Sequence, residues 1–144
     1  MTKDNSTFVA DPSLLRELAP RSRAITLSHD RILFHQGDQP AGVYILHEGS
    51  VALSMNSGDE ITLRTVAGAG SLLGLPAVIG NKPYSLTAKA QLNARISFVR
   101  SEDFLAIMQG QPMVMFRVLQ VLAQEIRAAR EAFSDFVDAS GVIG

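Results

Sequence analysis

The sequence contains no cysteine and no tryptophan, and neither sign of charge is in excess. Without cysteine, the chain cannot form disulfide bonds, thiolate zinc sites or iron–sulfur clusters, and it has no cysteine nucleophile. Thirteen Lys and Arg residues stand against fourteen Asp and Glu residues, which gives a formal net charge of −1 at pH 7. Because nucleic-acid binding depends on a cationic surface that releases counterions, this balance argues against a DNA-binding domain within these residues.

Long hydrophobic runs are also absent. The most apolar stretch covers residues 72–79, where Gly74 and Pro76 interrupt it far below the roughly 20 residues that a membrane span requires. We therefore expect no transmembrane segment and, because the first residues are polar, a cytoplasmic protein. Apolar residues nevertheless make up 47% of the 144 residues, which is enough to build the buried core of one globular domain.

From about residue 24 to residue 99 apolar and polar side chains alternate, which is the period of half-buried β-strands. The last of these alternating runs covers residues 92–98. Turn-forming residues break the pattern, and residues 56–59 separate two alternating runs and so predict a hairpin loop. Many short strands at such spacing are typical of a β-sandwich or a closed β-roll, because both limit the open edges of a sheet.

Two short helices are expected on either side of the strands. Pro12 suits a first helical position, so a helix should begin there and end before Pro20. After the strands, Ser101 is expected to be the N-cap of a second helix that ends at Gly110. The residues expected to pack inward from this second helix are Phe104, Leu105 and Met108.

A long third helix is expected to begin at Pro112, because neither Gly nor Pro interrupts the chain again before Gly141. Its apolar residues are spaced by four and three positions in turn, as in a coiled coil, over about three heptads. This predicted seam consists of Met115, Leu119, Leu122, Ile126, Ala129, Phe133 and Phe136. The helix could lie on its own domain; we favour a pair of such helices in a homodimer, because the two phenylalanines come too late for the β-domain to cover them.

The order of these elements and several short motifs resemble the effector-sensing domain of the Crp/Fnr regulators, which has the cyclic nucleotide-binding fold. The motifs lie at residues 33–38, 43–51, 70–74 and 85–90, and the resemblance covers roughly residues 12–137. The implied fold is mainly β with flanking helices, namely a double-stranded β-helix or jelly roll followed by a long dimerisation helix. The expected parts are a flexible N-terminus at 1–10, the β-roll with short helices at 11–111, the dimerisation helix at 112–140 and a tail at 141–144.

In that family a segment between two strands holds the ligand; we term it the cassette, here residues 70–90. The resemblance implies a Gly-Glu pair whose Glu binds the ribose, and an Arg-Ser/Thr-Ala run whose Arg binds the cyclic phosphate. This chain keeps Gly74, but it has Leu75 at the Glu position and Pro-Tyr-Ser-Leu at residues 83–86. Because an Arg–phosphate pair contributes two charge-assisted hydrogen bonds, its loss should weaken cyclic nucleotide binding by about 100-fold or more.

Two functions remain open for this altered cassette. In the first, it binds a small apolar or aromatic effector and signals through the dimer helix. In the second, the same side chains fill the cavity, and the domain is a ligand-free dimerisation or scaffold module. Lys82 could supply a positive charge, although it lacks the planar fork of an arginine. The candidate ligand-binding residues are Leu72, Gly74, Leu75, Pro76, Lys82, Tyr84, Ser85 and Leu86.

Enzymatic and metal-binding functions are not indicated by the sequence. The three histidines, His29, His35 and His47, lack an evident further ligand and are expected in strands or turns. Residues 68–71 are not followed by the Gly-Lys-Ser/Thr of a phosphate-binding loop, and residues 70–74 lack the spacing of a nucleophile elbow. We therefore expect no catalytic residue, metal or cofactor. The expected partners are a second copy of the chain and a small effector, and no helix-turn-helix is expected within these residues.

Overall fold

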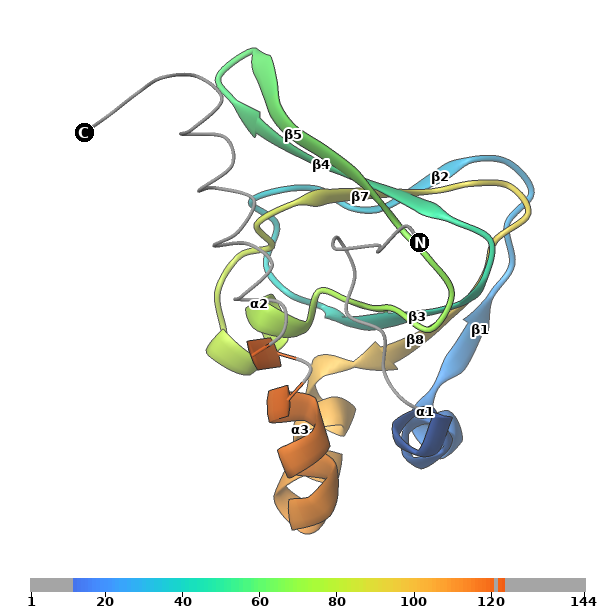
Figure 1. Ribbon diagram of the computed structural model, residues 1–144, viewed down its shortest axis with the longest axis vertical. Helices are drawn as coiled ribbons and strands as arrows, with labels where there is room; N and C mark the ends of the chain where they lie inside the picture. Colours follow the sequence, from blue (N-terminus) through green and yellow to red (C-terminus); the bar gives the residue numbers. More distant parts are fainter. Residues whose placement is uncertain (1–11, 121, 124–144) are drawn as a thin grey trace, which may run out of the picture.

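Two antiparallel sheets of four strands each lie face to face in the computed structural model, which describes residues 12–120 and 122–123 (Figure 1). The first sheet has the strand order β1-β8-β3-β6, and the second has the order β2-β7-β4-β5. The strands are β1 Arg23–Ile25, β2 Arg31–Phe34, β3 Gly42–Glu48, β4 Val51–Ser57, β5 Glu60–Ala67, β6 Leu72–Leu73, β7 Thr87–Ala90 and β8 Arg95–Arg100. Most connections carry the chain from one sheet to the other, so the predicted β-roll is confirmed.

Helices flank the roll and cover the outer side of the first sheet (Figure 1). They are α1 Pro12–Leu18 with a following 3-10 turn at Ala19–Arg21, α2 Leu75–Gly80 and α3 Ser101–Gly110. Residues 112–120 and 122–123 are also helical, as expected for the start of the third helix. Within the described part of the chain, no helix has the length and hydrophobicity needed to cross a membrane.

The buried side chains form two clusters, one on each face of the first sheet. The inter-sheet cluster lies inside the roll and contains Phe34, Leu46, Val51, Leu53, Ala67, Leu73, Ala77, Tyr84, Ala88, Ala90, Ala94 and Ile96. The helix-side cluster contains Leu14, Leu18, Val43, Ile45, Leu72, Leu75, Val78, Val99, Phe104, Ile107, Met108, Val114 and Val118. Neighbours such as Leu72 and Leu73 belong to different clusters, because successive side chains of a strand point to opposite faces.

The predicted hairpin loop is confirmed, with β4 and β5 paired up to Ser57 and Glu60. Gly58 in this turn has φ +65°, which is a backbone conformation that glycine adopts without steric cost. The expected strand over residues 92–98 is only partly correct, because β8 begins at Arg95. Leu92 lies in the preceding turn with 48% of its surface exposed, and its N–H donates to the Asp30 carboxylate over 2.8 Å.

Two expectations for α3 were wrong. Arg100, not Ser101, is the N-cap residue, and the Ser101 hydroxyl donates instead to the carbonyl of Pro40 over 3.0 Å. Leu105 is 37% exposed, whereas Ile107 is buried with Phe104 and Met108. The buried face of α3 is therefore rotated relative to the predicted one, because it packs toward α1 and the first sheet.

The seam predicted on the third helix lies partly within the described residues. Met115 is 38% exposed and Leu119 is 47% exposed, while Leu122 is half-buried against the helix-side cluster. Val114 and Val118 are buried and anchor this helix to the domain. The remaining seam residues, Ile126, Ala129, Phe133 and Phe136, and the predicted segments at 1–10 and 141–144, lie outside the described residues.

Candidate functional site

The cassette links the two sheets. Strand β6 of the first sheet leads through Gly74 into α2, and the segment 81–86 then climbs to β7 of the second sheet (Figure 1). Gly74 has φ +87°, and a Cβ atom added there would lie 2.7 Å from Cε1 of Tyr84. This position therefore requires glycine twice, for its left-handed backbone and for the space that the tyrosine ring occupies.

Leu72 and Leu75 face the helices. Both side chains have no exposed surface, and both belong to the helix-side cluster with Val78 of α2. Pro76 lies in the first turn of α2, where its missing N–H leaves no partner unsatisfied. Leu75, which the sequence analysis aligned with a ribose-binding Glu, is therefore an apolar side chain that holds α2 against the core.

Tyr84 faces the interior of the roll. Only 3% of its surface is exposed, although it follows the exposed residues 81–83. Its hydroxyl donates to the Gly42 carbonyl over 2.7 Å, and it accepts from the N–H groups of Ala41 at 3.1 Å and Gly42 at 3.2 Å. A phenol has one proton to donate and two lone pairs, so this hydroxyl is fully satisfied.

The Tyr84 ring and backbone are held as firmly as its hydroxyl. The ring stacks on Phe34 with centroids 3.8 Å apart and an angle of 17° between the planes. The Tyr84 N–H donates to the Asp38 carbonyl over 2.9 Å, and the Gly37 N–H donates to the Tyr84 carbonyl over 2.8 Å. Burial, only partly offset by the backbone hydrogen bonds, raises the pKa of Tyr84, so the phenol stays protonated at neutral pH.

The remaining predicted residues are less buried. Lys82 and Ser85 are exposed, and Leu86 is half-buried against the inter-sheet cluster. Four of the candidate ligand-binding residues, Leu72, Leu75, Tyr84 and Leu86, therefore do not line one common surface. The first two lie in the helix-side cluster and the last two lie at the inter-sheet cluster.

Phe34, Ala41 and Gly42 contact Tyr84 and were missed by the sequence analysis. They lie 42 to 50 positions from Tyr84 along the chain, and none of them is charged or part of a recognisable spacing. The motif at residues 33–38 was noticed, but only its resemblance to the family marked it. Sequence alone carried no signal that these residues form a slot for an aromatic ring.

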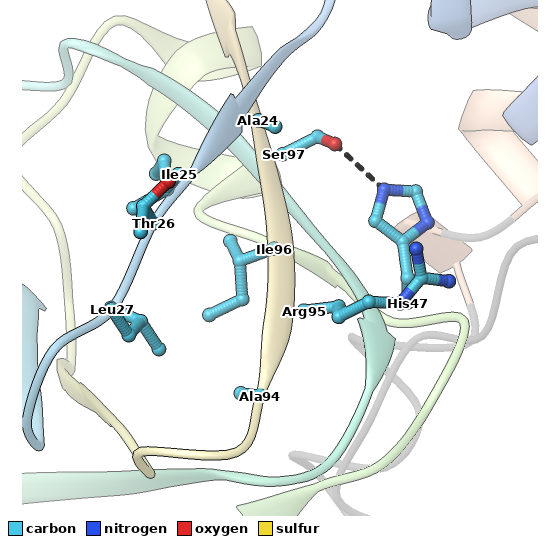
Figure 2. A pocket seen from close by; sticks show the side chains of 9 residues that line it. All are labelled: Ala24, Ile25, Thr26, Leu27, His47, Ala94, Arg95, Ile96 and Ser97. Atoms are coloured by element: carbon cyan, nitrogen blue, oxygen red, sulfur yellow. Dashed lines mark hydrogen bonds between the residues drawn. The ribbon is translucent and has the colours of Figure 1, made fainter.

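A cleft outside the cassette lies where β1 ends beside β8 (Figure 2). This cleft has a volume of about 350 Å³, and its lining residues are Ala24, Ile25, Thr26, Leu27, His47, Ala94, Arg95, Ile96 and Ser97. The Nε2 atom of His47 lies 2.7 Å from the Ser97 hydroxyl, as the dashed line in Figure 2 shows. Arg95 forms an exposed ion pair with Glu48 at 3.2 Å.

The three histidines occupy the turn and strand positions that were predicted. His29 contacts the Ser28 hydroxyl at 3.0 Å, and His35 lies 3.7 Å from the Asp38 carboxylate. Burial and the nearby charge of Arg95 lower the pKa of His47 below 6.5, so it is mostly neutral at pH 7. In the part of the chain that the structure describes, no group of three His, Asp or Glu side chains is placed to hold a metal ion.

Comparison with known proteins shows what this domain resembles. The sequence model of the cyclic nucleotide-binding domain matches residues 24–111. The chain is 28% identical over 126 residues to the cyclic AMP receptor protein of Thermus thermophilus, a match that covers 81% of this chain and 58% of that protein. It is 29% identical over 120 residues to human patatin-like phospholipase domain-containing protein 6, covering 80% of this chain and only 8% of that protein.

Solved structures show the same fold. The crystal structure of the catabolite activator protein of Thermus thermophilus matches with a TM-score of 0.74 at 21% identity, covering 88% of this chain and 60% of that one. The chain therefore spans little more than half the length of this regulator. Figure 1 and this likeness agree on a β-roll with flanking helices.

Proposed function

The chain belongs to the cyclic nucleotide-binding domain family, and we propose that it is the effector-sensing domain of a Crp/Fnr-type transcriptional regulator that does not bind cyclic AMP or GMP in the usual way. One observation carries this proposal. The two positions that would hold the ribose and the phosphate are occupied by Leu75, with no exposed surface, and Tyr84, with 3%. We propose no catalytic step and no cofactor for this domain.

The energetic reason lies in the desolvation of the ligand. A cyclic phosphate that enters the roll must exchange its water for protein donors, and an ionised group left unpaired there costs several kcal/mol. Tyr84 offers no free proton, because its hydroxyl already donates to Gly42. Lys82 is exposed in the segment before it, so it would have to leave water to reach the roll.

Signalling would pass from α2 to the third helix through the helix-side cluster. Leu75 and Val78 of α2 share this cluster with Val114 and Val118 of the third helix. A shift of α2 on effector binding would therefore change how the third helix packs against the helix-side cluster. We propose that the helix pairs with its copy in a homodimer, so that the shift alters the spacing of the attached output elements.

A second candidate function is a ligand-free dimerisation module. It is favoured by the same burial, since Leu72, Leu75 and Tyr84 already fill the space that they line. In that case the domain would hold two long helices together without responding to a small molecule.

Thermal unfolding in the presence of candidate ligands separates the two functions. The protein is heated with cyclic AMP, cyclic GMP and small apolar or aromatic compounds. A ligand at one hundred times its Kd should add about 2.7 kcal/mol to the free energy of unfolding. Stabilisation by an aromatic compound but not by a cyclic nucleotide supports the sensor, and no stabilisation by any class supports the scaffold. Stabilisation by cyclic AMP that Lys82→Ala abolishes would contradict the proposal.

A further inference from the structure

We propose that the cleft between β1 and β8 binds a small amphipathic carboxylate, with the carboxylate on Arg95 and Ser97 and a short apolar tail between the two strands. The site is separate from the cassette and does not depend on the sensing function proposed there. Its volume of about 350 Å³ is at the lower end of the range for small-molecule pockets, about 300–1,000 Å³, so the ligand would be small.

The cleft opens because β1 leaves the first sheet while β8 continues. The last residue pair between the two strands is Ile25 with Ile96. Thr26 and Leu27 then lead away toward β2 of the second sheet (Figure 1). Arg95 is the next residue of β8, and among the described residues its strand partner is Glu48 of β3 alone. A gap therefore remains beside Arg95 on the side that faces β1.

The apolar lining can hold a hydrocarbon tail. Figure 2 shows Leu27 and Ile96 in the space between β1 and β8. Ile96 and Ala94 belong to the inter-sheet cluster, and Ile25 and Leu27 are partly buried against it. A tail that enters between the strands would therefore exchange water for the edge of an existing apolar core.

Arg95 supplies the positive charge on the other side of β8, because successive residues of a strand point to opposite faces (Figure 2). One of its guanidinium nitrogens lies 3.2 Å from the Glu48 carboxylate, and both side chains of this ion pair are 66% exposed. Such an exposed pair contributes little to stability, and an arginine has five N–H donors. Arg95 can therefore bind a second carboxylate.

Ser97 and His47 add a hydroxyl donor beside this charge. Ser97 is only 9% exposed, and its hydroxyl lies 2.7 Å from Nε2 of His47. Burial and the charge of Arg95 lower the pKa of His47, so the imidazole is mostly neutral at pH 7. With its single proton on Nε2, His47 donates to the Ser97 oxygen, and the Ser97 proton is free to bind a ligand oxygen. The polar lining thus favours an acceptor with negative charge.

Imidazole NMR of the unaltered protein tests the site. The chain has three histidines, and the variant His47→Gln identifies the resonances of His47. At pH 7 and constant ionic strength, sodium hexanoate should move these resonances in a saturable way and leave those of His29 and His35 in place. No saturable movement below about 10 mM hexanoate, ten times a Kd of about 1 mM, overturns the inference.

Three other compounds separate the roles of head and tail. Hexan-1-ol and hexylammonium keep the six carbons but lack the negative charge, and acetate keeps the charge but lacks the tail. Each should need at least about tenfold more ligand for the same movement, because it loses either the charge-assisted hydrogen bonds or the apolar burial. Binding as tight as that of hexanoate by any of the three overturns the inference.

The variant Arg95→Gln removes the charge from an exposed side chain, so the fold should be kept. It should raise the Kd for hexanoate at least about tenfold. The matched control is Arg64→Gln, which removes an exposed arginine from β5 of the second sheet and should leave the Kd unchanged. Equal effects of the two variants would indicate attraction to the overall charge and overturn the inference. None of these outcomes bears on the cassette, which the cyclic nucleotide and aromatic compounds test separately.

Discussion

Removing one oxygen from Tyr84 should cost far more stability than its size suggests. The variant Tyr84→Phe keeps the ring on Phe34 but leaves the Ala41 and Gly42 N–H groups and the Gly42 carbonyl without their shared partner. A buried donor or acceptor that loses its partner costs about 1–3 kcal/mol. Ala41 is exposed and can recruit water, whereas Gly42 is buried, so we expect a loss of about 2–4 kcal/mol, mainly from Gly42.

The variant Tyr44→Phe is the matched control. The Tyr44 hydroxyl makes a single, part-buried hydrogen bond to the Leu33 carbonyl over 3.2 Å, so its removal should cost about 0.5–1.5 kcal/mol. Urea unfolding followed by far-ultraviolet circular dichroism measures both losses in a protein that lacks tryptophan. A loss for Tyr84→Phe no greater than that for Tyr44→Phe would refute the role assigned to the three hydrogen bonds of the Tyr84 hydroxyl.

Three further predictions concern other parts of the domain. If the proposed homodimer forms through the predicted seam, Leu119→Asp should raise its dissociation constant at least about tenfold in sedimentation, whereas Gln120→Asp on the adjacent face should not. Equal effects of the two variants would contradict the seam. Gly74→Ala should lower the free energy of unfolding by about 1–3 kcal/mol, and by more than Gly58→Ala, because Gly58 has positive φ but open space around it. The reverse order would contradict the close contact between Gly74 and the Tyr84 ring. Because the pKa of His47 is lowered from 6.5, protonation favours the unfolded chain, and the free energy of unfolding should fall as pH drops from 6.5 through the folded-state pKa. A difference in this free energy between the unaltered protein and His47→Gln that does not change with pH would contradict this.

The strand alternation predicted much of the roll, and its failures have physical reasons. Strand β6 has two residues, Leu72 and Leu73, that are buried on opposite faces, so it shows no alternation. Leu92 fits the period of β8, but the Asp30 carboxylate holds a turn there and the side chain is exposed. Alternation of apolar and polar residues along the chain cannot predict a hydrogen bond to a residue that is distant in sequence.

The candidate site was predictable only in part. The resemblance predicted a cassette at residues 70–90 and aligned Leu75 and Tyr84 with its two charged positions. It did not predict that these side chains face different clusters, nor that Phe34 and Gly42 receive the phenol. Those contacts arise when β2, β3 and the segment before β7 meet inside the roll, and their residues carry no charge that would mark them.

Calorimetric titration of the unaltered protein with cyclic AMP tests the central claim most directly. Because we propose that Tyr84 and Leu75 take the phosphate and ribose positions, we expect no saturable heat and a Kd weaker than about 1 mM, corresponding to less than about 4 kcal/mol of binding free energy. Saturable binding in the micromolar range would contradict this proposal, since that affinity requires charged partners and both Leu75 and Tyr84 are uncharged and buried.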